Sequence, residues 1–141
     1  MKLTYRHTLI ASYVGYITQA IISSLPPLLF ATFHREFGVS LEKIGLLVSV
    51  NFVTQILVDL LSVKFADKIG YRVLAVAAHT FAAAGLVLFA VLPGALPNPY
   101  AGLVIAMVLS AIGGGLTEVL ISPIVESLPG DEKARAMSLL H

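Results

Sequence analysis

The sequence predicts an all-α integral membrane protein. Of its 141 residues, 57% are hydrophobic and only 12% are charged, and the mean hydropathy is +0.91. Soluble domains carry about twice this share of charged residues. Four apolar runs are also long enough to cross a bilayer as helices, since each crossing takes about 20 residues.

The four predicted spans cover residues of about 8–30, 44–62, 73–92 and 100–128, and a fifth begins near 134. The first run follows basic residues as a signal peptide would, but its length and its lack of a small-residue cleavage site predict a retained span. Ser40 is expected to cap the second helix, and Pro26-Pro27 to end or bend the first. The connections at 31–43, 63–72 and 93–99 are short, so sequential helices should be antiparallel, and the fifth helix indicates a longer protein.

The basic residues predict the orientation in the membrane. Seven of the nine lie on one side of the predicted bundle, and two lie on the other. The first group is Lys2, Arg6, Lys64, Lys68, Arg72, Lys133 and Arg135; the second is Arg35 and Lys43. By the positive-inside rule the N-terminus is expected in the cytoplasm, in a plasma or inner membrane.

Several classes of function are disfavoured by composition. The chain has no cysteine, and its net charge of +1 comes without a basic cluster, which argues against a nucleic-acid partner. No nucleophile–base or metal-ligand constellation is present, so we expect neither an enzyme nor a cofactor or metal.

Polar side chains recur on one helix face in the first, second and fourth spans, at steps of three and four residues. Such side chains can join helices within a bundle, or they can line a hydrated cavity. Because three spans share the pattern, we expect a cavity between them, with the third span facing lipid. The candidate cavity residues are Tyr16, Gln19, Ser23, Asn51, Gln55 and Ser122.

Two embedded carboxylates stand out. Glu118 follows three glycines and precedes Pro123; if its helix reaches Leu128, it lies ten residues, or about 15 Å, from that end. That is near the middle of a ~30 Å hydrocarbon core, where an ionisable group usually faces a cavity. Glu118 is therefore the candidate proton carrier. Asp59 lies near a helix end, where an ion pair with Lys64 or Arg72 is expected instead.

The segment VKFADKIGYR at 63–72 resembles the signature G-x-L-A-D-[RK]-x-G-[RK]-[RK] of the major facilitator superfamily. Val63 and Tyr71 depart from it, and the matching positions are Asp67, Lys68, Gly70 and Arg72. The resemblance implies a twelve-helix fold of two six-helix halves, in which this chain would be part of the N-terminal half. It also implies that these four residues form a conformational latch against the opposite half.

A second segment, LTEVLISP at 116–123, is similar to the fourth helix of the fucose–galactose–glucose proton symporters, which have a glutamate five residues before a proline. The resemblance implies proton coupling by Glu118 beside a sugar site. The first-span aspartate of those symporters is absent here, where Gln19 and Ser23 are the polar groups.

Together these patterns predict a secondary active transporter for a small polar solute such as a sugar, driven by protons. Its expected partners are the solute, protons, the lipid bilayer and the remaining helices of the full-length transporter. A drug–proton efflux antiporter would use the same latch and carboxylate. A four-helix membrane assembly subunit without transport activity is the alternative from another class.

Overall fold

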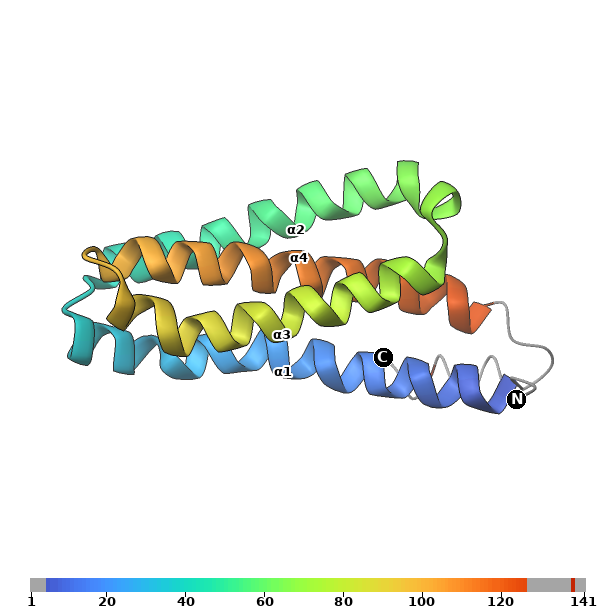
Figure 1. Ribbon diagram of the computed structural model, residues 1–141, viewed down its shortest axis with the longest axis horizontal. Coiled ribbons are helices and arrows are strands. Elements are labelled where there is room, and N and C mark those ends of the chain that lie inside the picture. The colour runs from blue at the N-terminus through green and yellow to red at the C-terminus, as the bar shows by residue number, and fades with distance from the viewer. Residues whose placement is uncertain (1–4, 127–137, 139–141) are drawn as a thin grey trace.

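The computed structural model describes residues 5–126 and residue 138, and it contains four long helices (Figure 1). They are α1 (Tyr5–Phe37), α2 (Leu41–Ile69), α3 (Tyr71–Ala95) and α4 (Pro99–Glu126). All four are long and apolar enough to cross a membrane. They lie along one common direction, with α1 and α3 running opposite to α2 and α4. The predicted all-α membrane fold is confirmed.

The first helix does not end at its prolines. α1 continues without a break through Pro26 and Pro27 to Phe37, so the pair does not end the helix, and the bend stays a prediction. A proline removes one backbone donor, whereas an unwound segment would leave several backbone groups unpaired in an apolar environment, which is far more costly.

The connections are shorter than predicted because the helices extend into them. Only three residues separate α1 from α2, beginning with Gly38 at a φ of +64°. Ser40 caps α2 as predicted, and its hydroxyl oxygen accepts the Lys43 N–H at 3.3 Å. A cap that was not predicted precedes α4, where the Asn98 side-chain oxygen accepts the N–H of Tyr100 at 3.1 Å.

The prediction of a ten-residue connection at 63–72 is wrong. α2 extends to Ile69 and α3 starts at Tyr71, so Gly70 alone separates them. Its φ of +91° lies in a region that residues with a side chain rarely adopt. The signature segment therefore lies on the last turns of one helix and the first turn of the next, rather than on a loop.

The fourth helix occupies the centre of the bundle and packs against all three others. Its three consecutive glycines face different neighbours, because successive residues of an α-helix are rotated by about 100°. A Cβ at Gly113 would press on the backbone of Ala78 and Ala82 in α3, and one at Gly115 would lie 3.0 Å from Val58 of α2. α4 can approach its neighbours closely because these side chains are missing.

The third helix, which was expected to face lipid, is buried along one face. One face packs along α4 and is buried: Leu74, Ala78, Ala82, Gly85, Phe89 and Pro93. A Cβ at Gly85 would lie 2.5 Å from the backbone nitrogen of Ser110 on α4. The opposite face exposes Val73, Val76, Val87 and Val91. Only that outer face is open to lipid contact, because small residues let the inner face reach α4.

The largest hydrophobic core lies toward the end of the bundle that holds the α1–α2 connection. It contains Phe33, Val39, Leu47, Phe89, Leu103 and Met107, and the rings of Phe33 and Phe89 stack with their centroids 5.9 Å apart. This core joins all four helices at one end and leaves the polar residues nearer the other.

The close α3–α4 contact gives a first prediction. Gly113→Ala should destabilise the folded protein by about 1–3 kcal/mol, the usual cost of overpacking, because the new methyl group meets backbone atoms of α3 that cannot move alone. Thermal unfolding in detergent measures the effect. Gly45→Ala, at a helical position with open space, is the matched control and should not destabilise. Equal stability of the two variants would contradict this packing.

Candidate functional site

A polar contact links the first and fourth helices. The Gln19 side-chain N–H donates to a carboxylate oxygen of Glu118, and the nitrogen–oxygen distance is 3.4 Å. Glu118 is exposed, and Gln19 is half-buried with its amide oxygen enclosed and without a hydrogen-bond partner. The structure therefore brings together two of the residues that the sequence had placed on one cavity.

Gln55 of α2 reaches the same place through Gly114. A Cβ at Gly114 would lie 3.2 Å from the Gln19 amide oxygen and 3.3 Å from the Gln55 amide nitrogen. Both amides thus lie over one glycine, one helical turn before Glu118. A larger residue at position 114 would fill the space that the two amides occupy. Gln19 of α1 and Gln55 of α2 therefore meet at Gly114, one turn from Glu118 of α4.

The other candidate cavity residues lie on the same three helices as Gln19, Gln55 and Glu118. Tyr16 packs against a cluster of Ile121 and Val125 between α1 and α4. Asn51 is half-buried one turn before Gln55, and Ser23 is exposed one turn after Gln19. Ser122 lies on α4 one turn beyond Glu118, and its side chain is outside the described part of the chain.

The depth of Glu118 follows from the length of α4. The helix runs through Pro123 to Glu126, so Glu118 lies eight residues, or about 12 Å along the axis, before the last described helical residue. This excludes a helix that stops at Ile121 and favours the deeper of the two placements considered from the sequence. The predicted continuation to Leu128 and the fifth helix near 134 lie outside the described residues.

Asp59 does not form the ion pair expected for it. Its Oδ1 atom is enclosed and has no hydrogen-bond partner. Within residues 5–126, neither Lys64 nor Arg72 bonds to it, and the Lys64 ammonium instead lies 5.8 Å from the ring centroid of Phe65. The reason is geometric, since five residues of helix turn Lys64 away from the side of α2 that holds Asp59.

The signature residues gather around the Gly70 break. Asp67 and Lys68 end α2, Arg72 follows in the first turn of α3, and all three side chains are exposed. The Tyr71 hydroxyl donates to the Asp67 carboxylate at 3.2 Å. Tyr71 is a departure from the signature, and only the structure reveals that it contacts the acidic residue of the motif.

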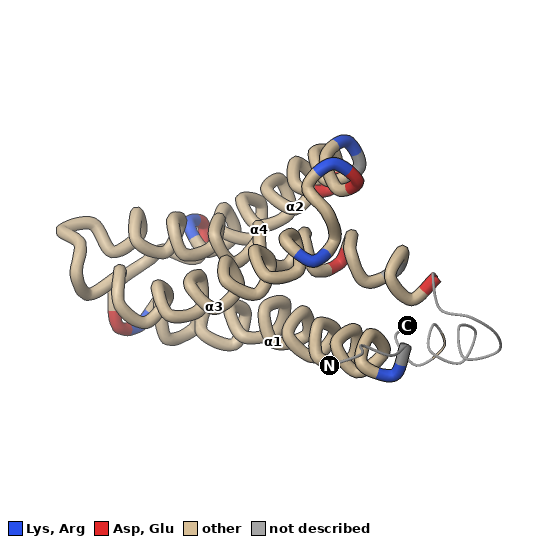
Figure 2. Tube along the Cα trace, turned by 45° about the vertical axis from the view of Figure 1, so that its right-hand side comes forward, with Lys and Arg blue, Asp and Glu red and all other residues tan. Residues whose placement is uncertain are grey.

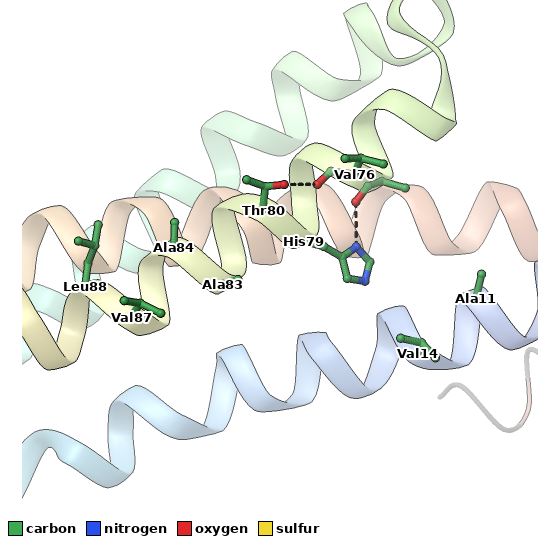
Figure 3. Close-up of a pocket in the computed structure, with 10 residues that line it drawn as sticks. Ala11, Val14, Val76, His79, Thr80, Ala83, Ala84, Val87 and Leu88 are labelled. Carbon is green, nitrogen blue, oxygen red and sulfur yellow. Dashed lines mark hydrogen bonds between the residues drawn. The ribbon is translucent and has the colours of Figure 1, made fainter.

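Glu118 lines neither of the two cavities described. An open groove of about 1000 Å³ separates α1 from α3, with Ala11 and Val14 on one wall and mostly apolar residues on the other (Figure 3). His79 points into it, and its Nδ1 lies 2.8 Å from the Ala75 carbonyl oxygen. The imidazole thus bonds within its own helix, as expected of a packing residue.

Four helices long and apolar enough to cross a membrane define a membrane protein, and comparison with known families gives its class. The model of the Major Facilitator Superfamily matches residues 9–141. The chain therefore belongs to this superfamily, whose members are secondary transporters. Comparisons with curated proteins and with solved structures gave no match.

The contact over Gly114 gives a second prediction. Gly114→Ala should fold with near-normal stability, because the new methyl group meets the ends of two flexible glutamine side chains, rather than the backbone met at Gly113. By displacing the amides it should weaken solute binding about two- to tenfold, the value of one hydrogen bond. Uptake kinetics measure this as a higher KM. An unchanged KM would contradict the placement of both amides at the solute site.

Proposed function

We propose that this chain is the N-terminal part of a twelve-helix transporter that takes up a small polar solute, such as a sugar, together with protons by alternating access. Membership in the superfamily supports transport as such. The solute class and the proton coupling rest on the side chains at the meeting of α1, α2 and α4, and the orientation rests on charge.

The contact between Gln19 and Glu118 is the observation that carries the proposal. An amide group offers both a donor and an acceptor. Gln19 can therefore donate to Glu118 when the carboxylate is ionised, and accept from it when the carboxyl is protonated. The Gln19 amide oxygen has no hydrogen-bond partner. The amide can therefore rotate to present its N–H or its oxygen to Glu118, according to the protonation state of the carboxyl group.

The neighbouring groups suit a hydroxylated solute. Gln19 and Gln55 present amides to one position over Gly114, and amides can donate to and accept from the hydroxyls of a sugar. The half-buried ring of Tyr16 offers an apolar surface three residues away. A protonated Glu118 beside such a solute would remove the cost of carrying a bare charge across the membrane.

The residues around Gly70 supply the conformational part of the proposal. Asp67 lies at the exposed end of α2, where its carboxylate can exchange the Tyr71 hydroxyl for the N-terminus of a helix in the opposite half. Lys68 and Arg72 flank it with positive charge, and Gly70 permits the sharp turn that holds these groups together. Release and formation of this contact would separate the two access states.

The orientation follows from where the charges gather. Lys and Arg lie toward the ends of the bundle, with long uncharged stretches between (Figure 2). Among the described residues, Arg6, Lys64, Lys68 and Arg72 belong to the end with Gly70, whereas Arg35 and Lys43 belong to the other. The positive-inside rule favours a cytoplasmic N-terminus in a plasma or inner membrane.

The coupling role gives a third prediction. Glu118→Gln keeps the shape of the side chain but cannot bind a proton, so it should abolish uptake driven by a pH gradient while solute exchange continues. Uptake and counterflow in proteoliposomes that contain the full-length transporter measure the two activities. The matched control is Glu126→Gln on the same helix, near its end, which should leave coupling intact.

The same preparation tests the solute class, with a panel of sugars and of cationic drugs. Accumulation of a sugar along an inward proton gradient supports the proposal, whereas proton-driven extrusion of a drug would assign an antiporter. Normal pH-driven uptake by Glu118→Gln would exclude Glu118 as the proton carrier in either case.

The latch gives a fourth prediction. Asp67→Asn removes the negative charge that favours a helix N-terminus, an interaction worth up to about 1 kcal/mol. Turnover should fall by up to about fivefold, while the affinity of the open state for the solute should not change. Initial rates and equilibrium binding separate the two quantities. Glu42→Gln, at the opposite end of α2, is the control, and normal turnover of Asp67→Asn would count against the latch.

A further inference from the structure

Asp59 is an embedded acid that the proposed function does not use. It lies on α2, and its Oδ1 atom is enclosed without a hydrogen-bond partner. Buried polar atoms in native proteins are nearly always paired, so an unpaired one calls for an explanation. The ion pair with a basic residue is not that explanation, because neither Lys64 nor Arg72 bonds to it within residues 5–126.

Few charged residues within the helices could balance the charge of Asp59. In the described helices, α1 has no charged residue between Arg6 and Arg35, α2 has only Asp59 between Lys43 and Lys64, and α3 has none after Arg72. On α4, Glu118 is the only charged residue before Glu126. His79 points into the groove toward α1 rather than toward α2 (Figure 3). The two embedded acids are thus not balanced by an embedded base on these helices.

The register of α2 on α4 places both acids at one level. The two helices run in the same direction (Figure 1), and Val58 lies against Gly115. Asp59 follows Val58 by one residue and Glu118 follows Gly115 by three, so along the axis they differ by less than one turn of about 5.4 Å. Asp59 also lies one turn after Gln55, on the same face of α2 as the amide that reaches Gly114.

We propose that Asp59 is a second proton-binding group of the transport site, so that the loaded site carries one proton on Asp59 and one on Glu118. Each ionised carboxylate within a membrane span carries a desolvation cost, and no embedded base on these helices offsets it. A proton on each carboxyl group removes both charges and adds no bulk. The inference rests on the proposed function, because it assigns a stoichiometry of two protons to the same cycle.

The stoichiometry can be measured from the concentration gradient that the transporter sustains. For a neutral solute, with the membrane potential clamped at zero, one unit of pH difference supports about tenfold accumulation with one proton and about 100-fold with two. Proteoliposomes that contain the full-length transporter should give about 100-fold for the unsubstituted protein and about tenfold for Asp59→Asn. Unchanged accumulation in Asp59→Asn, or tenfold accumulation by the unsubstituted protein, would overturn the proposal.

Two further variants keep the test decisive. Asp59→Glu retains a carboxyl group and should keep 100-fold accumulation even where Asp59→Asn fails to fold; a tenfold value would contradict the proposal. Glu118→Gln tests the proposed function separately, since without the proton on Glu118 accumulation should fall from about 100-fold to at most the roughly tenfold that one proton on Asp59 supports. If Glu118→Gln instead kept about 100-fold accumulation and Asp59→Asn lowered it to about tenfold, the coupling role of Glu118 would fail while proton binding by Asp59 would stand.

Discussion

The arrangement of this protein depends on the absence of three side chains at one point of α4. Gly113 meets the backbone of α3, Gly114 lies under the amides of α1 and α2, and Gly115 meets Val58 of α2. The α-helix rotates successive residues by about 100°, so three adjacent glycines open three sides of one helix. In a membrane, where helix association depends on close packing, such contacts can decide which helices become neighbours.

The polar site follows from the same constraint. A side chain at position 114 would meet the ends of both Gln19 and Gln55, and Gln19 is the residue that contacts Glu118. The α3–α4 pair contributes rigidity through Gly85 and Gly113, whereas α1 and α2 meet α4 partly through amides that can change partners. Both properties suit a transporter, in which some helices stay packed while polar contacts rearrange.

The two ends of the bundle differ in composition, since the largest apolar core lies at one of them. The aromatic and aliphatic core around Phe33 and Phe89 fixes the end with the α1–α2 connection. The opposite end has the Gly70 turn and exposed charges. The contact between Tyr71 and Asp67 spans this turn, so the acidic residue of the signature already has a partner within its own half. Any contact with another half would compete with that hydrogen bond.

The sequence by itself determined the helical membrane class, the approximate spans, the Ser40 cap and a polar face on each of three helices, which hold Gln19, Gln55 and Glu118. Hydropathy and helical periodicity are properties of local sequence, and they suffice for such features. Only the tertiary structure decided that Pro26-Pro27 stay within one helix, that Gly70 alone separates α2 from α3, that α3 packs along α4, and that Asp59 lacks the expected ion pair. Each of these depends on which helix lies opposite a given residue and how closely it approaches. Spacing along one chain cannot specify that, because the same small residue can face lipid or another backbone.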